Sequence, residues 1–271
     1  MPELPEVETT CRGIAPHIEN NIIDKVVVRN RNLRWPIPNG LNTTLKQQKI
    51  LSVTRRAKYL LLNTEKGTLI LHLGMSGSLR IVPTNTPAEK HDHFELQFSN
   101  GICCRLRDPR RFGAVLWSKD DVLEHKLLVN LGPEPLEKNF NAALLFEKTR
   151  KRKTSIKQFI MDAKIVVGVG NIYASESLFL AGITPTKPAG KITQQETTAL
   201  VKAIKKILKD AIKQGGTTLK DFTASDGKPG YFKQKLTVYD RKDQPCISCK
   251  KPIKHITLGQ RSTFYCAHCQ K

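Results

Sequence analysis

The chain is poor in several residue types, and each shortage excludes a class of protein. Only 6% of its 271 residues are aromatic, which argues against an extended stacking platform for single-stranded nucleic acid. No apolar run approaches the roughly 20 residues that a membrane-spanning helix needs. The N-terminus is acidic, unlike the basic start of a signal peptide. Internal repeats and nucleotide-binding fingerprints are also missing. We therefore expect a globular cytoplasmic protein that has no membrane contact and no nucleotide cofactor.

Acidic residues are also scarce relative to basic ones. The chain has 24 Asp and Glu against 45 Lys and Arg, for a formal net charge of +21. These charges are spread along the chain, and a field of this sign attracts polyanions. Nucleic acid is the partner that the composition favours. The length allows substantial hydrophobic cores and is typical of two domains.

Hydrophobic periodicity divides the chain into two unlike halves. A first helix should run to about His17, with one apolar face formed by Leu4, Val7, Cys11, Ile14 and Ile18. Short strands follow between residues 22 and 117, namely 25–28, 59–62, 68–71, 94–98 and 114–117, which favours a β-sandwich or barrel. Residues 131–136 have the Gly and Pro content of a linker. Helices should follow, including one that begins with a Thr193–Glu196 capping box and stops at Gly215-Gly216.

Four of the seven cysteines have the spacing of a metal site. They are Cys246, Cys249, Cys266 and Cys269, in two Cys-x2-Cys pairs. This spacing is typical of a zinc ion held by two tight turns in a reducing compartment. Four thiolates leave no open coordination position, so the expected single Zn2+ is structural.

The first six residues, Met1-Pro2-Glu3-Leu4-Pro5-Glu6, allow two interpretations. Loss of Met1 would leave the secondary amine of Pro2 beside carboxylates, which is the equipment of an iminium-forming nucleophile. The same residues also fit an ordinary helix start, with prolines in the first turn and carboxylates at the positive end of the dipole.

Two further segments could contact DNA. In Gly168-Val169-Gly170-Asn171, glycines precede a helix whose N-terminal amides could bind phosphate, or they could form only a packing turn. Nearby basic residues, Lys151 to Lys153 and Lys157, are either a solvated helix start or a backbone clamp. Asp108-Pro109-Arg110-Arg111-Phe112-Gly113 presents either a wedge for an opened duplex or a hairpin turn with a core phenylalanine.

Together these residues resemble a known family over essentially the whole chain. The resemblance is carried by residues 2–9, His72-Leu73-Gly74-Met75-Ser76-Gly77, residues 90–93, 108–113, 168–174 and 215–219, and the four cysteines. This pattern is similar to that of bacterial formamidopyrimidine-DNA glycosylase. The resemblance implies an α+β fold: an N-terminal β-sandwich with an N-terminal helix, a helical helix-two-turn-helix domain and a C-terminal zinc-binding β-hairpin. Expected bounds are residues 1–131 for the catalytic sandwich, 132–150 for a linker, 151–235 for the helical domain and 236–271 for the zinc finger.

The resemblance also implies an activity in base-excision repair. A monomeric glycosylase and AP lyase would remove 8-oxoguanine and formamidopyrimidines from damaged duplex DNA through a Schiff base, followed by β,δ-elimination. Pro2 would be the nucleophile, Glu3 the proton donor that opens the sugar, and Glu6 would lie beneath the amine. Lys58 would donate a proton in β-elimination, and Arg261 would contact phosphate and assist δ-elimination.

The remaining implied contacts are to DNA. Five residues would position the backbone, namely His91, Arg110, Arg152, Lys157 and Asn171. Met75, Arg110 and Phe112 would fill the gap left by the extruded base, and residues 217–231 would close over 8-oxoguanine. Two alternatives are an endonuclease VIII type glycosylase for oxidised pyrimidines and a non-enzymatic zinc-ribbon DNA-binding protein.

Overall fold

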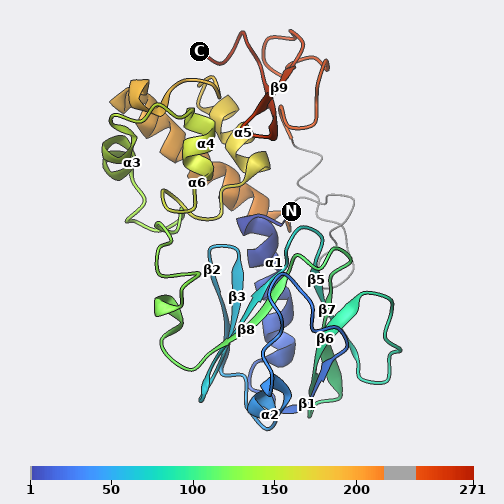
Figure 1. Ribbon diagram of the computed structural model, residues 1–271. Coiled ribbons are helices and arrows are strands. Elements are labelled where there is room, and N and C mark those ends of the chain that lie inside the picture. Colours follow the sequence, from blue (N-terminus) through green and yellow to red (C-terminus); the bar gives the residue numbers. More distant parts are fainter. Residues whose placement is uncertain (1, 217–235) are drawn as a thin grey trace. The chain divides into compact units, whose positions relative to one another are not determined.

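Figure 1 shows the computed structural model of the chain, which describes residues 2–216 and 236–271. The segment 217–231, expected to close over the damaged base, lies outside these residues. The described chain forms two compact units, residues 2–129 with 215–216 and residues 130–214 with 236–271. Within the described ranges, no helix has the length and hydropathy needed to cross a bilayer.

The first unit is a sandwich of two antiparallel four-stranded sheets. Their strand orders are β1-β6-β7-β5 and β2-β3-β4-β8. The elements of this unit are α1 (Leu4–Ile18), β1 (Ile23–Val28), α2 (Leu41–Leu45), β2 (Ser52–Arg56), β3 (Tyr59–Thr64), β4 (Gly67–His72), β5 (Ser78–Pro83), β6 (Asp92–Phe98), β7 (Ile102–Arg107), β8 (Ala114–Ser118) and the 3-10 helix η1 (Val122–Glu124).

One apolar core joins the two sheets to α1. Side chains such as Leu60 on β3, Leu96 on β6 and Ile14 on α1 are completely buried in a single cluster. α1 contacts strands of both sheets, and it can do so because its apolar residues recur at helical spacing. The N-terminal helix, the sandwich and the five expected strands are confirmed.

Three strands of the sandwich, β2, β5 and β7, were not expected from the sequence. All three contain arginine, as in Ser52–Arg56, Ser78–Pro83 and Ile102–Arg107, and a charged residue in a short segment favours a surface loop over a strand. Arg105 is nevertheless only 1% exposed, because its charge is paired inside the unit. The pattern of hydrophobic residues alone could not reveal that pairing.

The second unit combines helices with a β-hairpin. Its elements are α3 (Ala142–Thr149), α4 (Ile156–Met161), α5 (Asn171–Leu180), the 3-10 helix η2 (Ala189–Lys191), α6 (Gln194–Lys213), β9 (Lys254–Leu258) and β10 (Arg261–Tyr265). The Thr193–Glu196 capping box is present at the start of α6, and the helix ends before Gly215, as expected. The interval 132–150, expected as a linker, contains α3, which packs against α6.

Candidate functional site

The N-terminus places two carboxylates directly after Pro2. Glu3 is the N-cap of α1, and the Glu6 carboxylate accepts a hydrogen bond from the Glu3 backbone N–H at 2.8 Å. Both side chains are only 3% exposed. The helix-start interpretation is therefore correct for these residues, and it is compatible with the nucleophile interpretation. The cap fixes the backbone one residue after Pro2, whose nitrogen is an amide for as long as Met1 is attached.

Glu6 also contacts the last described residue before position 217. A Cβ added to Gly216 would lie 3.0 Å from Glu6 Oε1, and Gly216 has a φ of +79°. Only glycine combines this conformation with this close approach. The two glycines that end α6 in the sequence therefore also bring backbone against a carboxylate of the candidate site.

Lys58 lies on the hairpin turn between β2 and β3, and α1 holds that turn. Arg55 donates to Glu8 Oε2 at 2.7 Å and to the Ala57 carbonyl oxygen at 2.8 Å. Burial opposes ionisation of Glu8, but hydrogen bonds from Arg55 and Arg12 lower its pKa overall. This Glu8–Arg55 pair had no signal in the sequence, because its residues lie 47 positions apart. It links the helix that begins at the candidate nucleophile with the turn that carries Lys58.

Two adjacent turns carry the residues expected to enter the duplex. Phe112 is 45% exposed, so the interpretation of it as a core residue is wrong. The Arg110 guanidinium lies over its ring, with Cζ 4.9 Å from the ring centroid. Met75 is half-buried on the neighbouring turn. A Cβ on Gly74 would lie 2.5 Å from the backbone of Phe112 and Gly113, so these turns touch through their main chains.

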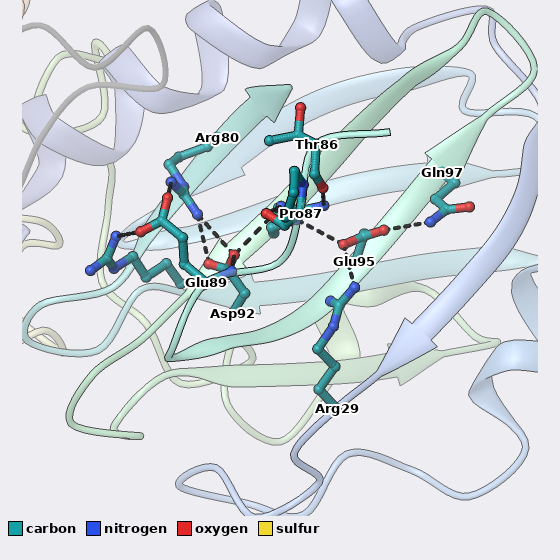
Figure 2. A network of polar contacts seen from close by, with 10 residues as sticks. Arg29, Arg80, Thr86, Pro87, Glu89, Asp92, Glu95 and Gln97 are labelled. Atoms are coloured by element: carbon teal, nitrogen blue, oxygen red, sulfur yellow. Dashed lines mark hydrogen bonds and ion pairs between the residues drawn. The ribbon is translucent and has the colours of Figure 1, made fainter. Parts of the chain in front are cut away.

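An ionic network that no sequence motif indicated holds the segment before His91 (Figure 2). Arg105 on β7 donates through Nε to Glu95 Oε2 at 2.7 Å. Its terminal nitrogens donate to the carbonyl oxygens of Thr86 and Pro87, each at 3.0 Å. These bonds fix the chain that leads into His91, which itself has a φ of +79° and is half-buried.

In the second unit, Lys157 and Asn171 are hydrogen-bonded to each other, and Lys157 is buried rather than exposed on an open surface. Lys157 is 1% exposed. Its ammonium group donates to Asn171 Oδ1 at 2.7 Å, Thr263 Oγ1 at 2.7 Å and the Ser262 carbonyl oxygen at 3.2 Å. Asn171 begins α5 and also donates to the Ser262 carbonyl oxygen at 2.9 Å. Arg152 is exposed just before α4.

Arg261 is exposed at the start of β10, and the hairpin turn before it is well defined. Gly259 and Gln260 form a two-residue turn with φ values of +55° and +59°, as a type I′ turn requires. A Cβ on Gly259 would lie 2.3 Å from the Gln158 side chain. The turn therefore packs against α4, the helix that carries Lys157.

The four cysteines form a site that fits zinc. Their Sγ atoms all lie within 4.8 Å of one another, with 3.4 Å between Cys249 and Cys266 and 3.9 Å between Cys246 and Cys269. Zn–S bonds of about 2.3 Å in a tetrahedron place sulfurs about 3.8 Å apart. Burial disfavours the Cys246 thiolate, but N–H groups of Cys249 and Ser248 lower its pKa to about 7. The donor set and its spacing thus suit one structural zinc ion.

A buried glutamate docks the zinc module onto α5. Glu176 is 1% exposed, and its carboxylate accepts hydrogen bonds from the backbone N–H groups of Thr237, Val238 and Tyr239 at 2.8–3.0 Å. The Thr237 hydroxyl adds a fourth bond at 2.6 Å. The sequence placed Glu176 on the helix after the glycines but gave no signal of this role, because its partners lie about 60 residues away.

Comparisons with known proteins match successive parts of the chain to domains found in one family. Family models match the formamidopyrimidine-DNA glycosylase N-terminal domain over residues 1–115, the formamidopyrimidine-DNA glycosylase H2TH domain over residues 131–223, and a zinc finger found in FPG and IleRS over residues 243–271. The formamidopyrimidine-DNA glycosylase of Hydrogenovibrio crunogenus is 56% identical over 271 residues, which are 100% of this chain and 97% of that relative.

Solved structures give the same result. The MutM (Fpg) protein of Thermus thermophilus has a TM-score of 0.89 and 34% identity, with 99% of this chain and 98% of that chain covered. A complex between the Lactococcus lactis Fpg and DNA containing an abasic site has a TM-score of 0.93 and 33% identity, with 99% of each chain covered. The identity to full-length relatives and the order of the matched domains show that the chain belongs to the formamidopyrimidine-DNA glycosylase family.

Proposed function

We propose that the protein removes 8-oxoguanine and formamidopyrimidines from duplex DNA and then cleaves the damaged strand. As a member of its family it is a DNA glycosylase with AP lyase activity. The observation that carries the proposed chemistry is the buried Glu3–Glu6 pair directly after Pro2. The enzyme acts in the cytoplasm, where bacterial DNA is found.

Pro2 becomes a nucleophile when Met1 is removed. Its nitrogen forms a bond to C1′ of the extruded nucleotide, the bond from C1′ to the base breaks, and the base leaves with the proton that the Pro2 amine gives up. Glu3 donates a proton to the sugar ring oxygen, so the ring opens and an iminium ion forms. Glu6 holds the Glu3 backbone through a 2.8 Å hydrogen bond, which keeps the nitrogen and the acid in a fixed relation.

Strand cleavage follows from the same iminium ion. The iminium acidifies the C2′ protons. The Glu3 carboxylate, ionised after it has protonated the ring oxygen, accepts one of them, so the 3′ phosphate leaves in β-elimination, and a second elimination expels the 5′ phosphate. Lys58 supplies a proton in the first elimination, and Arg261 binds phosphate and assists the second. Support comes from the fixed turns that carry both residues.

DNA binding uses residues of both units. His91, Arg110, Arg152, Lys157 and Asn171 position the backbone, and exposed Arg110 and Phe112 enter the duplex with Met75. Extrusion of a base costs about a few kcal/mol, which wedge contacts and phosphate contacts offset. We assign residues 1–131 to catalysis, 151–235 to the helical DNA-binding part, and 236–271 to the zinc finger, with residues 132–150 between the first two.

Borohydride trapping tests this function. The wild-type protein, with loss of Met1 checked by intact mass, should form a trapped adduct on a duplex containing 8-oxoguanine. One glycine inserted before Pro2 should abolish the adduct, because the Pro2 nitrogen becomes a tertiary amide. One glycine added after Lys271 is the matched control and should have no effect. Trapping only on thymine glycol would favour the endonuclease VIII type, and DNA binding without any adduct would favour a non-enzymatic protein.

A further inference from the structure

Asp108 is a completely buried carboxylate on the loop between β7 and β8, and no step of the proposed chemistry uses it. Its Oδ2 accepts a hydrogen bond from the Gly113 backbone N–H at 2.7 Å, which closes the six-residue turn that presents Arg110 and Phe112. Its Oδ1 is buried without a hydrogen-bond partner among the described residues. Burying a carboxylate that has one oxygen without a hydrogen bond costs free energy. We therefore expect Asp108 to perform a function at this position.

The main chain of Asp108 makes further bonds that converge on the same turn. Its carbonyl oxygen accepts a hydrogen bond from the Arg111 N–H at 3.1 Å and lies 3.0 Å from His93 Nε2. Its N–H donates to the His91 carbonyl oxygen at 3.0 Å. Asp108 thus holds the chain on both sides, toward His91 and toward the wedge turn.

The turn that carries Met75 is locked against this one. Gly74 has a φ of +65°, and a Cβ there would meet Gly113 N and Phe112 C at 2.5 Å. Its N–H donates to His72 Nδ1 at 3.0 Å. A Cβ on Gly113 would lie 2.7 Å from the His72 carbonyl oxygen and 2.8 Å from Asp108 Oδ2. Neither glycine leaves space for the two turns to shift relative to each other.

Packing covers only part of Phe112, because 45% of its surface is exposed. A side chain that enters a base stack must resist the bases that restack against it. Its backbone therefore has to be held by bonds to the rest of the protein. The hydrogen bond from Gly113 to the Asp108 carboxylate is the side-chain bond that closes the turn. Burial raises the pKa of Asp108, whereas the N–H groups of Gly113, Arg110 and Arg111 stabilise its ionised form.

We propose that Asp108 is a positioning residue for base extrusion, which holds Arg110 and Phe112 against the Met75 turn as one rigid wedge. This inference rests on the proposed function, because extrusion matters only if the protein acts on a base inside a duplex. Asp108 touches neither the damaged base nor the reacting atoms. Its loss should therefore reduce extrusion and leave the lyase chemistry intact.

The test compares two substrates of the full-length, zinc-loaded enzyme. Asp108→Ala should lower kcat/KM on a duplex containing 8-oxoguanine about 10- to 100-fold, the scale expected for a misplaced contact. Cleavage of an abasic site in a single strand needs no wedge and should stay within about 3-fold of wild type. Stopped-flow fluorescence of 2-aminopurine beside the lesion should show a matching loss of the extrusion phase. Asp108→Asn keeps an oxygen acceptor for the Gly113 N–H and should recover part of the activity.

Two controls separate positioning from general stability. Asp121 also accepts a backbone hydrogen bond, from Leu123 N–H at 2.9 Å, at a turn without proposed DNA contacts. Asp121→Ala should leave both substrates unchanged. Gly74→Ala should reproduce the duplex-specific loss. Gly101→Ala is the matched control, because Gly101 also has a positive φ, of +81°. It should not reproduce the loss, because no atom lies within 4 Å of an added Cβ there. Thermal unfolding confirms that each variant is folded.

Several results would overturn the inference. One is an equal loss of activity on both substrates in Asp108→Ala. Another is full activity of that variant on the duplex. A third is an Asp108→Asn variant whose kcat/KM on the duplex is no higher than that of Asp108→Ala. Failure of the proposed function would look different, because the wild-type enzyme would then give no trapped adduct with either substrate.

Discussion

Replacing Lys157 with methionine should destabilise the second unit. Methionine keeps the length of the buried stem but removes the ammonium group, which donates three hydrogen bonds, to Asn171, Ser262 and Thr263. The Thr263 hydroxyl is itself buried and would lose its donor, whereas the half-exposed Asn171 amide can regain water. The damage should therefore concentrate on the contact between α4 and β10.

The expected size follows from these bonds. A hydrogen bond to a charged group contributes about 1.5–3 kcal/mol, and an unsatisfied buried partner costs about 1–3 kcal/mol. Part of this loss is offset, because water can hydrate the Asn171 amide and because a buried methionine, unlike a buried ammonium group, has no charge to desolvate. We expect the unfolding free energy of the unit to fall by about 3 kcal/mol, which corresponds to about 10 °C in its unfolding midpoint.

Differential scanning calorimetry of the zinc-loaded protein measures this change, with the exposed Lys153→Met as the matched control. A midpoint within about 1 °C of wild type would refute the reasoning. DNA binding gives a second readout, because Lys157 and Arg261 are both proposed to contact the DNA backbone. The slope of DNA affinity against salt concentration should fall by about one phosphate contact in Lys157→Met and by about one when Arg261 is replaced.

Two further predictions concern protons and metal. Burial, together with the charges of Lys58 and Arg34, lowers the pKa of His72 to about 4 from 6.5. The unfolded chain therefore binds an extra proton between these values, so the first unit should lose about 3 kcal/mol as the pH falls from about 7 to 4. His72→Gln should flatten that dependence in urea titrations, and an unchanged slope would contradict a neutral native imidazole. Cys249→Ser should lose the zinc ion and productive DNA binding, because the module has little core of its own, while Cys11→Ser retains both; full activity in a zinc-free preparation would contradict this.

The amino-acid sequence alone was sufficient for the elements that local patterns encode. Apolar residues at helical spacing predicted α1, and alternating or continuous apolar runs predicted five strands of the sandwich. The Thr193–Glu196 pair marked the start of α6, and the spacing of four cysteines predicted the zinc site. Each of these signals lies within a few residues or within one motif, so neighbouring side chains carry it without knowledge of the fold.

Only the tertiary structure determined which charged side chains are buried and which partners they have. The sequence left Lys157 as part of either a solvated helix start or a clamp on the DNA backbone, and it gave no sign that the ammonium group is bonded to Thr263, 106 residues away along the chain. Nothing in the sequence marked Arg105 as buried, and it is bonded to Glu95 of the adjacent strand. Asp108 belongs to the turn motif that the sequence showed, and it also connects that turn with His91. A buried charge is stable only beside its partner, and the partner is brought there by folding rather than by proximity in the sequence.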